Sequence, residues 1–140
     1  MQYKKFNDVY VLRLEKGEEV HTELKKFAME NNFKGGYIFG IGALIDIKIG
    51  YYSLETQEYV TRDFKNGMEV TGLMGNLSVL NNEPFFHLHV NLGDENFSLY
   101  GGHLVSGTVS ITLELIFRPF DDELTRAFYE VEKFNLLKLR

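Results

Sequence analysis

An alternation of apolar and polar residues after Gly107 constrains the fold more than any other feature of the sequence. Successive side chains of an extended strand point to opposite faces of a sheet, so alternation places all the apolar residues on one face. That face is formed by Val109, Ile111, Leu113, Leu115 and Phe117. The pattern predicts a long strand with one buried side, which ends where Pro119 follows.

Further strands are predicted by similar patterns, separated by turn signals such as Asn66-Gly67. In the strand Met68–Leu80, strict alternation would place Val70, Met74 and Asn76 on the same side. The other predicted strands are Val9–Leu14, Tyr37–Leu44, Ile45–Tyr51, Tyr59–Asp63, the segment after Pro84, and Phe97–His103.

Two segments are predicted to be helical. Gly17-Glu18-Glu19 begins the first, and Val20, Leu24, Phe27 and Ala28 then recur at helical spacing until Asn31-Asn32. His21 is expected to be exposed on this helix and receives no role. Asp121-Asp122 is predicted to cap a second helix that carries Leu124 and Phe128. The expected fold is α+β: a single domain over residues 1–140, with a predominantly antiparallel sheet of about seven strands and one helix near each terminus.

Composition limits the classes of function. The 140 residues carry a formal net charge of −5 and include no cysteine, which excludes disulfides, thiolate metal sites and cysteine nucleophiles. The absence of cysteine fits a reducing cytoplasm, and no apolar run has the length of a signal peptide core or a bilayer span. We therefore expect a cytoplasmic protein without a membrane partner. The negative charge indicates weak or no DNA binding, because nonspecific affinity depends on a basic surface.

Three of the four histidines lie between Pro84 and Gly107. His87 and His89 share one face of a strand, and a turn at Gly93–Asn96 would bring His103 back beside them on the returning strand. Three imidazoles with an open fourth position are typical of a reactive zinc site, whose bound histidines usually direct their second ring nitrogen to a carboxylate, carbonyl or water. The alternative is three half-buried strand histidines that form hydrogen bonds with their neighbours.

These segments together resemble the plant and prokaryote conserved (PPC) domain. The resemblance covers Leu12 to about Phe117 and rests on Leu14–Val20, Gly40–Ala43, Gly50–Tyr52, Gly67–Val70, Leu73–Asn76, His87–Val90, Gly101–Leu104 and Gly107. It implies a free-standing prokaryotic member that forms homotrimers. Such members are often labelled DNA-binding proteins because the plant proteins carry a basic AT-hook, but this sequence contains no Arg-Gly-Arg core.

The family's fold is similar to that of acetolactate decarboxylase, a zinc enzyme with a His-x-His pair and a later histidine. His87, His89 and His103 match that arrangement, so the resemblance implies a metal site, with zinc as the first choice. Glu69 is the candidate general acid or base, followed by Glu114. Arg118 is a candidate partner for a substrate carboxylate. The commoner explanation of the two glutamates is a solvated strand residue or ion-pair partner, and that of the arginine is a surface residue.

Two functions follow as hypotheses. The first is a homotrimeric metal-dependent protein, such as a lyase or hydrolase, that acts on a small anionic or carbonyl substrate. The second is a DNA-binding or regulatory interaction module. The residues are compatible both with an enzyme and with a non-enzymatic binding protein.

Overall fold

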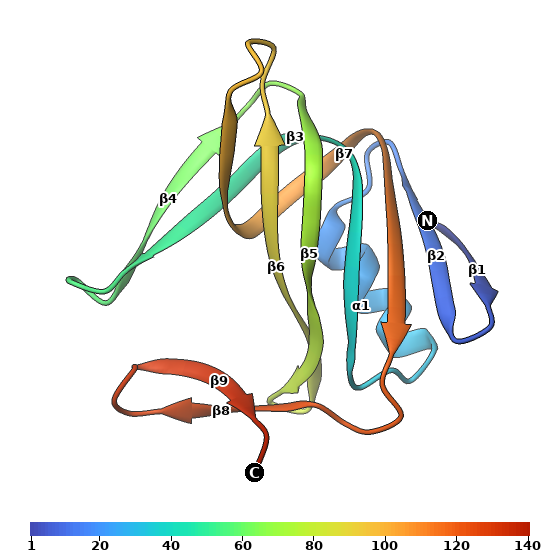
Figure 1. The fold of residues 1–140 in the computed structure, drawn as a ribbon, viewed down its shortest axis with the longest axis vertical. Coiled ribbons are helices and arrows are strands. Elements are labelled where there is room, and N and C mark those ends of the chain that lie inside the picture. The colour runs from blue at the N-terminus through green and yellow to red at the C-terminus, as the bar shows by residue number, and fades with distance from the viewer.

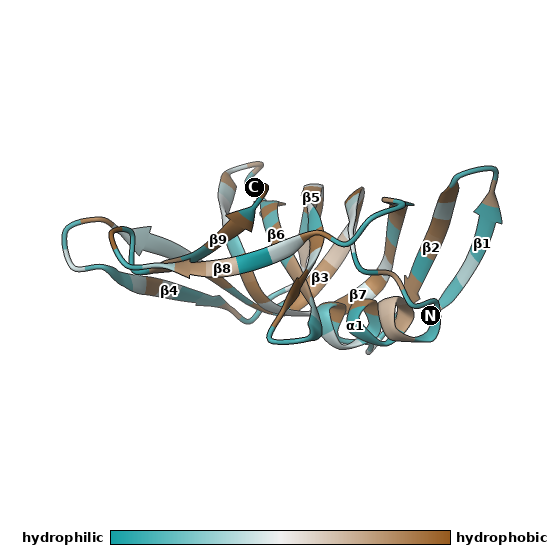
Figure 2. Cartoon of the chain, turned by 90° about the horizontal axis from the view of Figure 1, so that it is seen from below, coloured by the Kyte–Doolittle hydropathy of each residue, from teal (hydrophilic) through white to brown (hydrophobic).

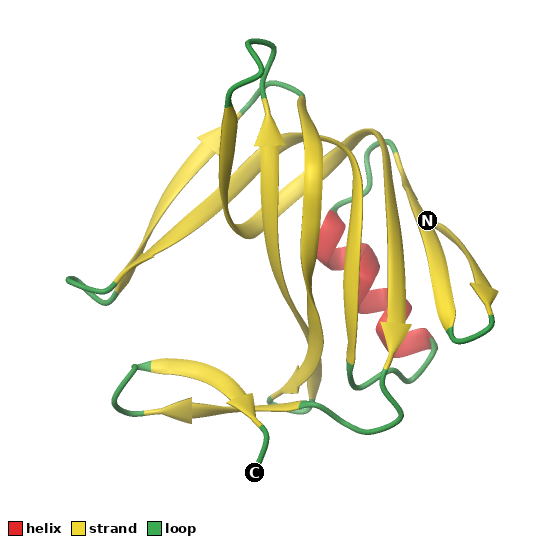
Figure 3. Cartoon of the chain, in the orientation of Figure 1, coloured by secondary structure: helices red, strands yellow, loops and turns green.

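The computed structural model describes residues 1–140 as nine strands and one helix (Figures 1 and 3). The helix is α1 (Val20–Glu30). The strands are β1 (Gln2–Phe6), β2 (Val9–Glu15), β3 (Gly36–Ser53), β4 (Glu58–Phe64), β5 (Met68–Leu80), β6 (Glu83–Gly93), β7 (Leu99–Pro119), β8 (Thr125–Tyr129) and β9 (Phe134–Lys138).

Four strands form a closed ring of hydrogen-bonded neighbours. β3 pairs with β5, β5 with β6, β6 with β7, and β7 pairs again with β3. The β1–β2 ribbon extends the sheet from β7, and β4 extends it from β3. All these pairings are antiparallel, so the predicted predominantly antiparallel α+β fold is confirmed. The hairpin β8–β9 joins through one parallel pair, Val79 with Thr125.

The structure has nine strands rather than about seven, because it adds β1, β8 and β9 while two pairs of predicted strands are each continuous. Tyr37–Leu44 and Ile45–Tyr51 both belong to β3, which has 18 residues, and Phe97–His103 and the segment after Gly107 contribute to β7, which has 21. Irregular register between these two strands lets them bend without interrupting their pairing. Long bent strands are what allow the ring to close.

Helix α1 forms where the sequence predicts it. The Glu19 side chain caps its first turn by accepting a hydrogen bond from the Thr22 backbone N–H at 2.8 Å, and Asn31 ends it. Its buried residues are Val20, Leu24, Phe27 and Ala28. Figure 2 shows the helix lying along one face of the strands, and no helix of the chain has the length and apolar character needed to cross a bilayer.

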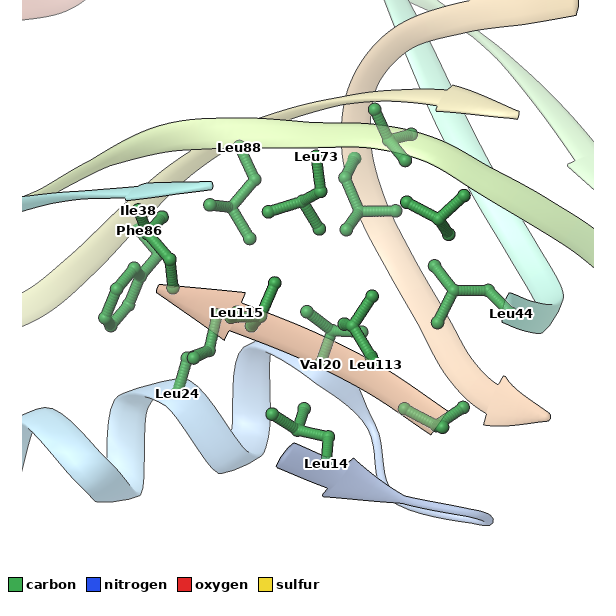
Figure 4. Packing of buried hydrophobic residues seen from close by; sticks show 14 of the residues in the cluster. Leu14, Val20, Leu24, Ile38, Leu44, Leu73, Phe86, Leu88, Leu113 and Leu115 are labelled. Carbon is green, nitrogen blue, oxygen red and sulfur yellow. The ribbon is translucent and has the colours of Figure 1, made fainter. Parts of the chain in front are cut away.

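The core lies between α1 and the inner face of the strands (Figure 4). Leu113 and Leu115 of β7 lie against the helix, while Leu73 of β5 and Leu88 of β6 close the opposite side. Each fully buried leucine contributes roughly 1.5–3 kcal/mol through the hydrophobic effect. The core therefore fixes the inner residues of β5, β6 and β7, and with them the direction of the outward ones.

One residue of the predicted β7 face, Ile111, and the predicted face of β5 are wrong, and both errors occur at irregularities in the pairing. Ile111 is 71% exposed, where the register of β7 with β3 shifts between Gly42 and Leu44. Met74 is 57% exposed whereas Val70 is buried, because the register of β5 with β6 shifts between Val70 and Gly72. Between Val70 and Gly72 a bulge adds one residue to β5 and so exchanges the two faces beyond it. In β7 the faces are the same on both sides of Ile111, because Val109 and Leu113 are both buried.

The predicted C-terminal helix is also wrong, because this segment forms the β8–β9 hairpin. Leu124 precedes β8 and donates its backbone N–H to the carbonyl of Lys34, and Phe128 lies within the strand as an exposed residue. Thr125, Phe128 and Tyr129 are residue types that favour extended backbone. Contacts between Arg126 and β5 then hold the hairpin in place, a tertiary effect that outweighs the apparent cap at Asp121-Asp122.

Candidate metal centre

The alternation of β6 places two histidines on the outer face of the ring. Leu88 lies between them in sequence and is 0% exposed, so the core holds the backbone from which His87 and His89 project outward. Their ring centroids lie 5.1 Å apart. The two imidazoles therefore lie side by side, as the spacing predicts.

His103 completes the group from β7. It pairs directly with His89 across the β6–β7 ladder, and its ring centroid lies 5.2 Å from that of His87 and 5.8 Å from that of His89. One ring nitrogen of each residue lies within 4.8 Å of those of the other two. The predicted proximity of the three imidazoles is confirmed, whereas metal binding by them stays a prediction.

The three histidines lie at the wall of a cavity of about 500 Å³. Aromatic residues of three strands form much of the remaining wall: Tyr52 of β3, Tyr59 of β4 and Phe134 of β9. The Tyr59 ring lies 5.4 Å from that of His103 and 5.3 Å from that of Tyr52. The cavity thus places the histidine nitrogens beside a largely apolar space of small-molecule size.

The environment favours the neutral form of two of the imidazoles, His87 and His103. Burial, the positive charge of Arg126 and the neighbouring histidines lower the pKa of His87 from 6.5 to about 4. Burial and the nearby His89, His21 and Arg126 also lower the pKa of His103. Neutral imidazoles keep a lone pair free, which is the form that binds a metal.

The buried polar atoms of the site support a bound group. Nδ1 of His103 and the Tyr52 hydroxyl are buried without a hydrogen-bond partner in the chain. An unsatisfied buried polar atom is unfavourable, and a ligand would relieve that cost. Nitrogens bound to tetrahedral zinc lie about 3.3 Å apart, which follows from Zn–N distances of about 2.0–2.1 Å. The three ring nitrogens lie within 4.8 Å of one another, which is close enough for them to share one ion.

Arg126 is a site residue that sequence reasoning missed. It projects from β8 and donates from Nε to the Ser78 hydroxyl at 2.9 Å, and from Nη2 to Oδ1 of Asn76 at 3.0 Å. Its Nη2 also lies 3.4 Å from Nδ1 of His87. Ser78 and Asn76 belong to β5, so these contacts attach the C-terminal hairpin to the strand beside the histidines.

Glu69, the candidate acid or base, does not line the cavity beside the histidines. It is exposed on β5, and Met74, the β5 residue that pairs with His89, lies about 16 Å further along the strand at roughly 3.3 Å per residue. The catalytic role of Glu69 stays a prediction, because within a single chain its carboxylate lies far from the three histidines.

The other charged candidates lie elsewhere on the sheet. Glu114 is exposed and pairs in register with Arg13 of β2. Arg118 forms an ion pair with Asp8 at 2.6 Å, which favours the interpretation of Arg118 as a surface residue. The expectation of an exposed His21 is wrong, because His21 is half-buried and its Nε2 lies 2.8 Å from the carbonyl oxygen of Leu104.

Several solved structures share this fold over nearly the whole chain. A metal-containing protein from Archaeoglobus fulgidus is 33% identical, with a TM-score of 0.87 and coverage of 97% of both chains. A plant- and prokaryote-conserved (PPC) protein from Pyrococcus horikoshii is 32% identical, with a TM-score of 0.85 and coverage of 99% of this chain and 95% of that one. A "putative dna binding protein" from Bacteroides thetaiotaomicron is 26% identical, with a TM-score of 0.94 and coverage of 98% and 96%.

One curated relative matches more distantly. The chain is 28% identical over 105 residues to the Bifunctional protein GlmU of a Synechococcus strain, a match that spans 74% of this chain but only 16% of the relative. The family model of the Plants and Prokaryotes Conserved (PCC) domain matches residues 1–121, which include all three clustered histidines. The chain therefore belongs to the plant and prokaryote conserved domain family.

Proposed function

We propose that this protein binds a divalent transition metal, with zinc as the first choice, through His87, His89 and His103. The observation that carries the proposal is the approach of three imidazole nitrogens to within 4.8 Å of one another at the wall of a cavity. The similarity to a metal-containing archaeal protein supports it further.

The donor set determines which metals fit. Three neutral imidazoles suit zinc and other borderline transition metals better than calcium or magnesium, which prefer oxygen ligands. Three protein ligands leave a coordination position open, as reactive rather than structural sites do. When bound, a metal of this kind polarises a carbonyl oxygen or lowers the pKa of a bound water.

The remaining residues of the site favour a small anionic or carbonyl substrate. Tyr52, Tyr59 and Phe134 offer apolar walls that exclude water, and Arg126 contributes a positive charge beside His87. We retain Glu69 as the candidate general acid or base. For this role, either Glu69 of another copy of the chain would have to approach the histidines, or a large substrate would have to extend from the histidines to Glu69.

We further propose a homotrimer. A row of register partners crosses the outer face of the sheet from Val11 through Ile116, Phe39 and Met74 to His89. Phe39 is 45% exposed, and Ile41 of the same strand is 60% exposed. A monomer seldom leaves so continuous an apolar row in water, which favours its burial against another copy beside the histidines.

Metal analysis of the protein purified without chelators tests the central proposal. We expect about one equivalent of zinc per chain in the wild type and none in His89→Ala. His21→Ala is the matched control, because His21 lies outside the cluster, and it should retain the metal. Wild-type protein that takes up no zinc, cobalt or nickel after dialysis would contradict the proposal.

The second candidate function is DNA binding, favoured by the description of the Bacteroides structure. The net charge of −5 opposes it. We expect affinity for duplex DNA to be weak and to collapse between low and physiological salt, because only screened charge attraction would support it. Sequence-selective nanomolar binding at physiological salt, measured by fluorescence anisotropy, would favour DNA binding over a small-molecule function.

A further inference from the structure

Arg126 is a half-buried arginine without an acidic partner. The ion pairs of the chain each join a cation to a carboxylate, and none of them includes Arg126. Its hydrogen bonds go to three neutral oxygens: Oγ of Ser78, Oδ1 of Asn76 and the carbonyl of Asn135, at 2.9, 3.0 and 3.0 Å. These contacts fix the direction of the guanidinium but leave its positive charge uncompensated.

The fold holds this charge firmly beside the histidines. Ser78 is 0% exposed, so the hydroxyl that orients Arg126 belongs to the core. The Phe85 ring of β6 lies 5.2 Å from the guanidinium carbon. Burial lowers the pKa of Arg126 as well, a sign that its charge is partly removed from water. A fixed and partly desolvated cation is a preorganised site for an anion.

The space beside Arg126 has the matching character. A cavity of about 320 Å³ is lined by Arg126, His87, His103, Tyr59, Phe85 and Phe134, among others, and no aspartate or glutamate lines it. The second cation there, Lys133, is paired with Glu130 at 2.7 Å. Arg126 is therefore the unpaired charge of a cavity whose other walls are largely aromatic.

The contact between Arg126 and His87 leads to the same conclusion. A guanidinium can only donate, so His87 must accept at Nδ1 when Nη2 approaches to 3.4 Å. If His87 binds a metal through Nε2, Nδ1 instead carries the ring proton and faces the guanidinium, so two donors oppose each other. Metal-bound histidines normally donate that second N–H to an acceptor such as a carboxylate. An anion that contacts both groups would accept from each of them.

We propose that the cavity binds a small organic carboxylate whose charged group contacts Arg126 and His87 and whose apolar body lies against Tyr59, Phe85 and Phe134. A single unpaired arginine among aromatic walls matches a monoanion with an apolar body better than a hydrated phosphate dianion, which needs more donors. The inference rests on the proposed function only in that the carboxylate and the metal would share His87.

Calorimetric titration with benzoate, and with its neutral isostere benzamide, tests the proposal on the full chain. We expect benzoate to bind the wild-type protein and benzamide to bind at least about tenfold more weakly, since a charge-assisted hydrogen bond carries a discrimination of that order. Arg126→Gln should weaken benzoate binding by a similar factor. The matched control is Arg62→Gln, because Arg62 also stacks on aromatic rings but lies outside both cavities, and this variant should bind benzoate normally.

The outcomes separate this inference from the metal site. Equal binding of benzoate and benzamide, stronger binding of inorganic phosphate, or unchanged affinity in Arg126→Gln would overturn it. The first two comparisons need no variant, so they decide the question even if Arg126→Gln unfolds. The same titrations are run on zinc-loaded and chelator-treated protein. Zinc uptake without charge-dependent carboxylate binding overturns the inference alone, whereas carboxylate binding without zinc uptake overturns the proposed function alone.

Discussion

Gly102 lies so close to Gly50 that a Cβ atom on Gly102 would stand 2.7 Å from the Gly50 carbonyl oxygen. The contact lies where β7 passes β3, immediately before His103, which pairs in register with the same glycine. The absence of a side chain at Gly102 is therefore a condition for the position of His103 beside His89.

Replacing Gly102 with alanine should separate the two strands and displace His103. We expect a loss of about 1–3 kcal/mol in the free energy of unfolding, the usual cost of overpacking, together with weaker zinc binding. Urea denaturation and a chelator competition assay measure the two effects. Gly72→Ala is the control, because its Cβ would meet its nearest neighbour at 3.7 Å, an ordinary contact. Equal effects of both substitutions would show that the approach of Gly102 to Gly50 is unimportant.

The stability of the metal-free protein should fall between about pH 6.5 and pH 4. Burial and the charge of Arg126 lower the pKa of His87 from 6.5 to about 4 in the folded state, so the unfolded chain binds a proton more readily in this range. Because the unfolded state gains protons first, acid favours unfolding, and stability is regained as the pH rises. Thermal unfolding across this range should show a weaker pH dependence in His87→Asn. An identical pH dependence in the variant would refute the assignment to His87.

Glu19 should stabilise α1 as its N-terminal cap. Burial alone would raise the pKa of Glu19, but hydrogen bonds from the Thr22 backbone N–H and hydroxyl outweigh it and lower the pKa. We expect Glu19→Ala to cost about 1 kcal/mol in urea denaturation at neutral pH. Glu30→Ala, at the opposite end of the same helix, should cost little, because a carboxylate there opposes the helix dipole. A larger loss from Glu30→Ala would contradict the capping role.

The exposed apolar row predicts the state of assembly. Sedimentation at micromolar concentration should give a trimer for the wild type, and Phe39→Lys should shift it towards the monomer, since a lysine would place a charge within the buried contact. Leu54→Lys is the control, because Leu54 lies in the exposed turn between β3 and β4. A wild-type chain that sediments as a stable monomer would exclude the trimer.

Local patterns predicted the regular parts of the fold. The alternation around Leu88 and the helical spacing of Val20, Leu24 and Phe27 both report which residues face the core, and the structure agrees with both. Alternation fails where a bulge or bend adds a residue, as before Gly72, because the extra residue leaves no mark in the hydrophobic pattern. The short strand β1 was missed because all of its residues are exposed, so it carries no alternating burial.

In the candidate site, too, local patterns predicted some residues and missed one that is placed by tertiary structure. His87 and His89 are neighbours on one strand, and a hairpin returns His103, so short-range rules sufficed to bring these residues together. Arg126 lies 39 positions from His87 and reaches it only because β8 attaches to the end of β5. The only local signal was the strand-favouring composition of Thr125–Tyr129, and even that would not have indicated which way the arginine points.

The placement of Leu88 between two histidines also determines which genetic changes the centre can tolerate. Substitutions at outward positions of β6 can alter its chemistry while the inward residues continue to hold the fold. A one-residue insertion or deletion just before His87 would exchange the two sets, moving the imidazoles into the apolar interior and turning Leu88 towards the cavity. Natural variation in this segment should therefore proceed by replacement of residues, with changes of length confined to the turns at either end.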